Sequence, residues 1–349
     1  MVERSPSAGG DAGAPTAGPR LYVGVDVGGT KILAALAEES GVIRKRCRLT
    51  TPRDCPQEEV LSAVGSAIAA VLKDGGCGSG DIEAVGIAVP GVVDPKRGVV
   101  IVCPILPLDG AAIAQHVAEG LGTLIPIVVG NDCDLGVLGE NWLGAARGTR
   151  SAVGILVGTG IGGGFVRKGR LLRGSQHGAM EVGHMTLQLD GPLCACGNRG
   201  CLEALASRTA IERDLREAIA GGRQSVLPEL LDGDLSVIRS GALRKALARG
   251  DTLVSEILTR AAEALGQGCL SVAHLLDPEV IVLGGGVVEA CGSFLLPIVE
   301  RILAADPLAA GRAPTAVRLA ALGDDAVVLG AVAAARTRVR RSPFLKKYA

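Results

Sequence analysis

The feature that most constrains the fold of this chain is a strand–glycine-turn–strand unit that occurs twice. The first copy is LYVGVDVGGTKILAALAE, residues 21–38, and the second is SAVGILVGTGIGGGFVRKGRLL, residues 151–172. In each copy an apolar run typical of a buried strand leads into a glycine turn, and a second apolar run follows. The similarity of the two copies predicts an internal duplication, and with it an α/β protein of two lobes.

The segments around the two copies predict strands and helices in alternation. Further strands are expected at 42–50, 82–91, 125–132, 279–288 and 316–322. Helices are expected at 56–73, 134–144, 293–304 and 324–339, with a mainly helical region at 203–273.

The domain organisation is predicted from this order of elements. Residues 1–20 form a tail rich in Gly, Ala, Pro and Ser, which we expect to be disordered. A small α/β lobe is expected at 21–130 and a large α/β lobe at 131–323, and the helix at 324–338 is expected to pack back on the small lobe. The basic tail 339–349 is interpreted as a solvated end rather than a binding patch.

Composition narrows the possible functions. Of 349 residues 51 are glycine, roughly twice the usual share of ~7%, which indicates tight turns and close approaches. A hydrophobic content of 48% excludes a disordered chain, while zero net charge and 2% aromatic residues argue against nucleic acid and membranes as partners. The chain has no apolar run of ~18 residues and its first 20 residues contain no apolar stretch, so we expect a cytoplasmic protein.

Three glycine turns follow predicted strands: the first turn DVGGTK (26–31), the second turn VGTGIGGG (157–164) and the third turn LGGG (283–286). Backbone amides in such turns can surround anionic oxygens. Any one of them could be a plain hairpin turn, but two at equivalent places of a repeat, joined by a third, favour the binding of nucleotide phosphate and ribose. The pattern is neither a Walker A loop nor a convincing Rossmann fingerprint.

The sequence GND, residues 130–132, lies where a predicted strand meets a predicted helix. Asp132 could simply cap the helix, because its side chain can accept hydrogen bonds from free amides there. Beside phosphate-binding turns it is instead a candidate general base, since phosphoryl transfer to a hydroxyl needs a carboxylate that accepts the proton.

A third group lies within residues 181–203, where three cysteines and one histidine come close together in a glycine-rich loop. His184, Cys194, Cys196 and Cys201 form a Cys3His set suited to a closed, structural zinc site. Unpaired core thiols or a disulfide are the alternatives. The other seven cysteines have apolar neighbours and are interpreted as small core residues: Cys47, Cys55, Cys77, Cys103, Cys133, Cys269 and Cys291.

Several of these stretches together resemble the ROK family of sugar kinases, in pattern closest to its ATP-dependent glucokinase branch. They are DVGGTK, GIAVPGVVD, GNDCDLGVLGE, GTGIGGGF, EVGHM and CACGNRGCLEALAS, spread over residues 21–335. The resemblance implies an actin-like ATPase (ribonuclease H-like) duplicated two-lobe fold, with a cleft between the lobes and a zinc knuckle at 184–201. It also implies ATP-dependent phosphorylation of a hexose, first of all D-glucose to glucose 6-phosphate. N-acetylglucosamine, N-acetylmannosamine and fructose are the alternative substrates.

The resemblance also implies residue roles. Asp132 matches the catalytic base. The sugar ligands that it implies are Asn131, Glu181, His184, Glu203 and the backbone of Gly91. It implies an ATP and phosphate site, with Asp26 near Mg²⁺, made of Asp26, Gly28, Gly29, Thr30, Lys31, Thr159, Gly160, Gly284 and Gly285. Structural zinc would be held by His184, Cys194, Cys196 and Cys201.

Four positions depart from the family pattern and bear on the choice of sugar: Ile105, Leu108, Asp134 and Met180. A ROK transcriptional repressor would need a helix-turn-helix domain ahead of the first turn, and only 20 residues precede Leu21, so we do not expect one. A non-catalytic sugar-binding regulator is the other alternative, against which Asp132 and the first turn argue. From the family we expect a homodimer or homotetramer.

Overall fold

The computed structural model describes residues 18–122, 124–309, 311, 313–339 and 343–344. The tail predicted at 1–20 therefore lies outside the described residues up to position 17, and most of the tail predicted at 339–349 lies outside them as well. Among the helices that are described, none is long and apolar enough to cross a membrane.

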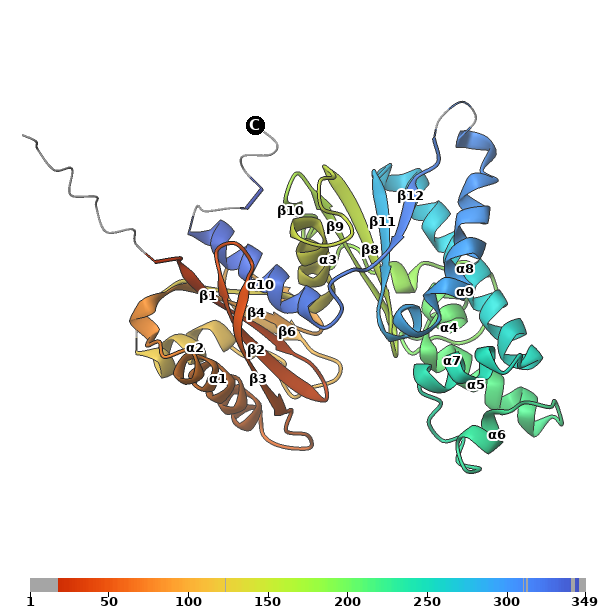
Figure 1. Ribbon diagram of the computed structural model, residues 1–349, viewed down its shortest axis with the longest axis horizontal. Coiled ribbons are helices and arrows are strands. Elements are labelled where there is room, and N and C mark those ends of the chain that lie inside the picture. Colours follow the sequence, from red (N-terminus) through yellow and green to blue (C-terminus); the bar gives the residue numbers. More distant parts are fainter. Residues whose placement is uncertain (1–17, 123, 310, 312, 340–342, 345–349) are drawn as a thin grey trace, which may run out of the picture.

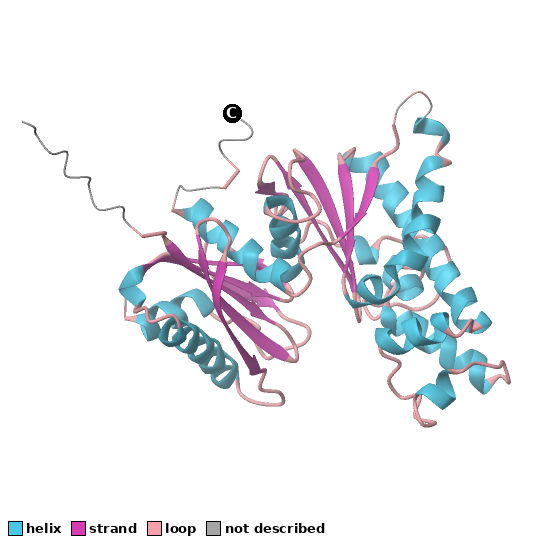
Figure 2. Ribbon diagram, viewed as in Figure 1, coloured by secondary structure: helices cyan, strands magenta, loops and turns pink. Residues whose placement is uncertain are grey.

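Two five-stranded sheets form the frame of the molecule (Figures 1 and 2). From edge to edge, the first sheet contains β3 (Ile43–Thr50), β2 (Lys31–Glu38), β1 (Leu21–Val27), β4 (Ile82–Val89) and β7 (Ile127–Asn131). The second sheet contains β10 (Arg170–Leu171), β9 (Ile161–Arg167), β8 (Ser151–Val157), β11 (Val280–Gly284) and β12 (Ala316–Leu319). A separate hairpin, which the sequence analysis missed, consists of β5 (Val92–Asp94) and β6 (Val99–Val102).

The two sheets have the same topology. β1 pairs antiparallel with β2 and parallel with β4, and β8 pairs in the same way with β9 and β11. β7 and β12 then complete the parallel side of each sheet. The predicted duplication is confirmed, and it extends beyond the two glycine-turn units to the parallel strands.

Helices lie between the sheets and on their outer faces, so that the molecule is layered (Figure 1). The middle layer contains α3 (Asp132–Trp142) and α10 (Asp325–Arg338), which pack on each other; α10 contacts β1 and β4, and α3 contacts β8 and β9. α1 (Gln57–Asp74) and α2 (Ile113–Leu121) lie on the outer side of the first sheet. On the outer side of the second sheet are α4 (Leu202–Ala206), α5 (Arg208–Ala220), α6 (Leu227–Leu230), α7 (Ser240–Ala248), α8 (Thr252–Leu276) and α9 (Gly286–Ala304).

Glycines allow the middle layer to pack closely. A Cβ atom on Gly24 of β1 or Gly86 of β4 would collide with the backbone of α10. Where α10 crosses α3, a Cβ on Gly330 would collide with the carbonyl group of Leu135. Part of the glycine excess therefore serves the contact of helices with sheets and with each other, a use beyond the predicted turns.

Each sheet has its own apolar core. The first core lies between the first sheet and its outer helices, and the second lies between the second sheet and helices such as α8 and α9. Six of the seven cysteines interpreted as core residues belong to these cores or pack against them: Cys47, Cys55, Cys77, Cys103, Cys269 and Cys291. Cys133 instead lies at the start of α3.

Two predictions about the end of the chain were wrong. The helix predicted at 293–304 begins at Gly286, because Gly285 follows β11 directly and caps the helix. Phe344, in the tail expected to be solvated, is buried, and a Cβ on Gly169 would collide with its side chain. Phe344 therefore packs beside the turn between β9 and β10 and belongs to the apolar cluster of α3 and α10.

Candidate active site

The predicted site residues lie at the carboxyl ends of the parallel strands. β1 leads into the first turn, β4 ends shortly before Gly91, and β7 ends at Asn131. The Asn131 side-chain amide donates a hydrogen bond of 3.0 Å to the carbonyl of Gly91, which joins two of these ends. β8 and β11 lead into the second and third turns in the same way. The carboxyl edge of such sheets is where α/β proteins bind their ligands.

The first turn is closed by a hydrogen bond of 2.9 Å from the N–H of Gly28 to the carbonyl of Lys31. The hydroxyl of Thr51, on the loop after β3, donates to the carbonyl of Gly28 at 2.6 Å. Lys31 forms an ion pair with Asp324, immediately before α10, with 2.8 Å between Nζ and Oδ1. Lys31 therefore already has a carboxylate partner, which the sequence did not indicate.

The second turn is one residue shorter and closes with 2.9 Å between the N–H of Gly158 and the carbonyl of Gly160. Oε2 of Glu203, from α4, accepts a hydrogen bond of 2.8 Å from the N–H of Ile161. Oε1 of Glu203 lies 3.7 Å from Sγ of Cys194. Glu203 therefore connects the second turn with the cysteine cluster.

The third turn lies directly beside the second. Gly285 has a φ of 85°, in the left-handed region that favours glycine, and it caps α9. A Cβ at this position would collide with the backbone of Val157, the last residue of β8. The fold thus brings together the two turns of the large lobe that were predicted to bind the nucleotide.

Asp132 is the first residue of α3. It is not the helix cap: the cap is Asn131, whose Oδ1 accepts a hydrogen bond of 3.0 Å from the N–H of Asp134. Oδ1 of Asp132 accepts from the N–H of Cys133 at 2.9 Å. Burial raises the pKa of Asp132, the charge of Glu181 adds to this, and the hydrogen bond from Cys133 opposes it. The N-cap of α3 is therefore Asn131, and Asp132 binds only the next free amide; its role as general base stays a prediction.

Asp26 occupies the end of β1 just before the first turn. Burial raises the pKa of Asp26 to about 7, the negative charge of Asp132 raises it further, and Lys31 lowers it. When a carboxyl group out of water faces a second acid, a nearby cation stabilises its ionised form. The position therefore fits Mg²⁺ that arrives with a nucleotide.

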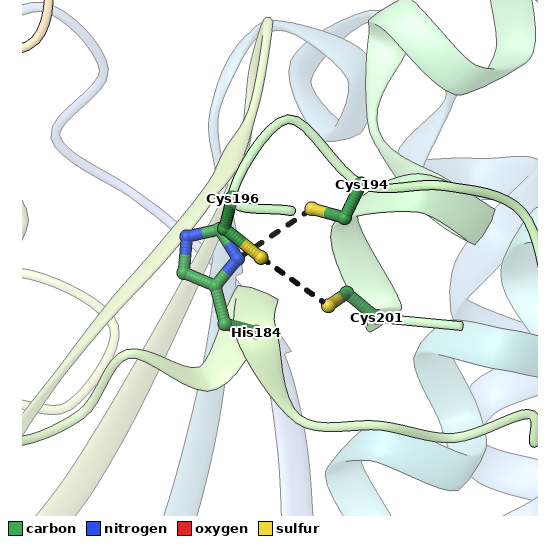
Figure 3. Close-up of side chains that lie close together, drawn as sticks. All are labelled: His184, Cys194, Cys196 and Cys201. Atoms are coloured by element: carbon green, nitrogen blue, oxygen red, sulfur yellow. Dashed lines mark hydrogen bonds between the residues drawn. The ribbon is translucent and has the colours of Figure 1, made fainter. Parts of the chain in front are cut away.

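His184 and the three cysteines form one cluster (Figure 3). His184 ends the short 3-10 helix η2 (Val182–His184), and the ligand atoms of all four residues lie within 4.8 Å of one another. Sγ of Cys196 and Sγ of Cys201 are 3.7 Å apart, and Sγ of Cys194 is 3.7 Å from Nδ1 of His184. In a tetrahedral zinc site with Zn–S bonds of about 2.3 Å, neighbouring sulfurs are about 3.8 Å apart. The donor set and its spacing fit zinc.

Three of the four departures from the family pattern have distinct surroundings. Leu108 is fully buried in the first core, so it shapes packing and does not line a surface. Ile105 is exposed and lies over the first turn, where a Cβ on Gly29 would be 3.0 Å from its Cδ1. Met180 has a φ of 68° and packs against the second core.

The fourth departure, Asp134, is a half-buried acid in the first helical turn of α3. Burial raises the pKa of Asp134 to about 7, and Arg173 opposes the shift. Its Oδ1 is buried without a hydrogen-bond partner among the described residues and lies against Gly164 of β9. Where the family pattern has the amide side chain of Asn, this chain thus has a carboxyl group whose Oδ1 lacks a hydrogen-bond partner among the described residues.

The sequence analysis missed Arg173, Arg208 and Asp324. Each comes from an element far along the chain from its partner, so no local pattern could have revealed the contact. A cavity of about 560 Å³ lies at the opposite end of β8 from the second turn, lined by residues such as Arg150, Arg167 and Glu279, and contains none of the predicted site residues.

Comparisons with known proteins identify the family of this chain. The family model described as "ROK family" matches residues 22–338. A glucokinase of Thermotoga maritima is 34% identical over 92% of this chain and 99% of its own length. The structure of a ROK family glucokinase from Streptomyces griseus in complex with glucose and AMPPNP is 33% identical, covers 91% of this chain and 99% of its own, and superposes with a TM-score of 0.78. A ROK hexokinase from Thermus thermophilus, 34% identical over 92% of this chain and 99% of its own, has a TM-score of 0.75. With its duplicated two-domain α/β fold and a family match along nearly the whole described chain, this protein belongs to the ROK family.

Proposed function

We propose that the protein is an ATP-dependent hexose kinase that converts D-glucose to glucose 6-phosphate. The observation that carries this proposal is the position of Asp132, a half-buried acid at the start of α3 whose charge acts on Asp26 beside the first turn. Its own pKa is raised chiefly by burial and further by the charge of Glu181. The name and bound ligands of the related Streptomyces griseus glucokinase support glucose and ATP as the pair of substrates.

In this mechanism Asp132 accepts the proton of the sugar hydroxyl. The hydroxyl oxygen forms a bond to the γ-phosphorus, the bond from that phosphorus to the bridging oxygen breaks, and ADP leaves with the electron pair. A pKa raised by burial makes the carboxylate a stronger base. Asp26 would help to hold Mg²⁺ together with the nucleotide, and the metal would neutralise part of the negative charge of the phosphates.

The sugar would be held by side chains at the edge of the cluster. Asn131, Glu181, His184 and Glu203 supply amide, carboxylate and imidazole groups that bind hydroxyls. Zinc on Nδ1 of His184 would fix its ring and leave the other nitrogen for the sugar. Its role is structural, since the three cysteines and His184 complete four ligands. We place the enzyme, as a homodimer or homotetramer, in the cytoplasm, which suits a thiolate metal site.

The test of the function is ADP release over a panel of hexoses and N-acetylhexosamines with ATP and Mg²⁺. Glucose should give the highest kcat/KM. Asp132→Ala should lower kcat about 10³-fold while glucose binding stays measurable, because a general base contributes on the order of 10²–10⁴. Asp134→Asn, which alters the neighbouring acid, is the matched control and should keep kcat within about threefold, a small loss by that standard. If the panel yields no turnover, the kinase proposal is wrong and the sugar-binding regulator takes its place.

Metal analysis tests the zinc site separately. We expect one zinc per chain, and Cys196→Ala should lose both the metal and most of the glucose affinity. Cys77→Ala, a half-buried cysteine outside the cluster, should change neither. Full glucose affinity in a zinc-free Cys196→Ala protein would show that the metal does not build the sugar site.

A further inference from the structure

Arg208 lies against the second turn, and no predicted role accounts for it. Its Nη2 donates a hydrogen bond of 2.8 Å to the hydroxyl of Thr159 at the centre of the turn. Its backbone N–H donates to the carbonyl of Gly158 at 2.9 Å, and the hydroxyl of Thr209 donates to the carbonyl of Thr159 at 2.8 Å. The start of α5 and the second turn are therefore fixed to each other by main chain and side chains.

The position of Arg208 is electrostatically unfavourable without an anion. It is the first residue of α5, a helix of 13 residues, and the amino end of a helix carries a partial positive charge that repels cations. Its partner Glu212, one turn along the helix, offsets this in part. Glu212 is also within 3.5 Å of Arg216, so two arginines share one carboxylate. The cluster of Arg208, Glu212 and Arg216 keeps a net positive charge beside Thr159.

The Arg208 guanidinium also has hydrogen-bonding capacity left. Its side chain is 23% exposed, whereas the side chain of Glu212 is 9% exposed, so the arginine reaches the surface and the acid does not. Among the described residues its side-chain hydrogen bonds go to Thr159 and Glu212, which leaves three of the five N–H groups of a guanidinium. The second turn itself contains neither lysine nor arginine.

We propose that Arg208 binds the phosphates of the nucleotide at the second turn. It supplies the positive charge that the turn lacks, and its contact with Thr159 holds the guanidinium next to the backbone amides of the turn. An arginine suits this task because its planar N–H groups match phosphate oxygens in pairs. This inference rests on the proposed function, since Thr159 is a phosphate-binding residue only if the chain binds ATP.

The experiment measures the affinity of the full-length, zinc-loaded protein for adenosine, ADP and ATP by calorimetry in Arg208→Gln, Arg208→Lys and Arg216→Gln. Arg208→Gln should weaken ADP and ATP by about 10- to 100-fold, the scale of a charge-assisted hydrogen bond, and leave adenosine within about twofold. Arg208→Lys keeps the charge without the paired geometry and should weaken ADP by about 3- to 10-fold. Arg216→Gln removes the same unit of charge from the cluster without touching Thr159, so it should weaken ADP by less than about threefold.

Steady-state kinetics separate binding from general damage. In Arg208→Gln the KM of ATP should rise while the KM of glucose stays within about twofold, as expected for a lost phosphate contact. Equal effects of Arg208→Gln and Arg216→Gln, or a loss of adenosine affinity as large as that of ADP, would overturn the proposal. If Arg208→Gln does not fold, the ADP-to-adenosine ratio of Arg208→Lys decides. Wild type that binds ADP but phosphorylates no sugar contradicts the proposed function alone; wild type that binds no nucleotide contradicts both.

Discussion

The first and second turns occupy equivalent places in the repeat but have different charged neighbours. The Arg53 guanidinium donates to the carbonyl of Gly29 in the first turn at 2.8 Å, and the Glu203 carboxylate accepts from the N–H of Ile161 at the second. Each is closed by a glycine N–H that donates at 2.9 Å across the turn. Around the first turn the cation Lys31 is paired with Asp324, which also binds Arg48, and the buried acid Asp26 precedes the turn. Around the second turn a net positive cluster with Arg208 comes from α5.

This difference shows how a duplicated unit can divide one task. The repeat supplies a glycine turn twice, whereas the charged side chains come from β1, β2, β3 and Asp324 in one case and from α4 and α5 in the other. Under the proposed function, we expect the first turn to bind a metal-bound part of the nucleotide and the second to bind bare phosphate oxygens. Changing the charged groups one turn at a time should therefore have unequal effects.

The largest effect is expected at the acid of the first turn. Asp26→Asn should lower kcat by about 10²-fold or more, because it removes the carboxylate that would hold Mg²⁺ beside the phosphates during phosphoryl transfer. Thr159→Ala in the second turn should mainly raise the KM of ATP, by about 10-fold, the scale of one hydrogen bond to a charged group. Initial rates over a range of ATP concentrations measure both. Equal losses of kcat would mean that the turns are not specialised.

Replacing Asp134, the acid with an unpartnered oxygen in α3, should stabilise the protein, whereas replacing Asp26 should impair it. Asp134 in the folded protein holds its proton up to about pH 7, whereas the unfolded chain loses it near the ordinary pKa of 3.8. The stability contributed by the protonated group is therefore complete below pH 3.8 and is lost as the pH rises to about 7. Asp134→Asn should raise the free energy of unfolding at pH 8 by on the order of 1–3 kcal/mol, and by much less at pH 4. Urea unfolding at the two pH values tests this, and a gain that does not depend on pH would contradict it.

The smallest expected effect is the difference between alanine substitutions of one glycine in each turn, Gly160 and Gly29. A Cβ on Gly160 would collide with Oε2 of Glu203, so Gly160→Ala should displace this carboxylate from the N–H of Ile161. We expect the KM of glucose to rise about 10-fold, equal to about 1.4 kcal/mol. Gly29→Ala meets only the mobile end of Ile105 and should stay within about threefold, or less than 1 kcal/mol. A larger effect of Gly29→Ala than of Gly160→Ala would reverse the comparison.

Local patterns predicted the parts of this molecule that are local in the chain. The strands around the two turns, the junction at Asn131 and Asp132, and the cluster of His184 with three cysteines all follow from residues that are near in sequence. The choice of Asn131 over Asp132 as the cap did not, because both residues can accept from free amides and only the geometry at the end of β7 decides.

The charges around the turns could not be predicted because they depend on distant partners. Lys31 and Asp324 are 293 residues apart in the chain, and Arg208 reaches Thr159 only when the start of α5 lies against the second turn. The start of α9 was misplaced for another reason: the glycines of the third turn suggested a longer loop, but one of them caps the helix.

The position of α10 has a consequence for the synthesis of the chain. This helix covers β1 and β4 and touches their backbone at Gly24 and Gly86, yet it is synthesised more than 200 residues after them. While the ribosome produces residues 132–324, at ~5–20 residues per second, one face of the first sheet waits tens of seconds for its cover. The small lobe therefore cannot complete its fold on the ribosome before the large lobe has been synthesised. Nascent chains that stop before Asp325 expose an apolar sheet face, to which chaperones would bind or through which the chains would aggregate.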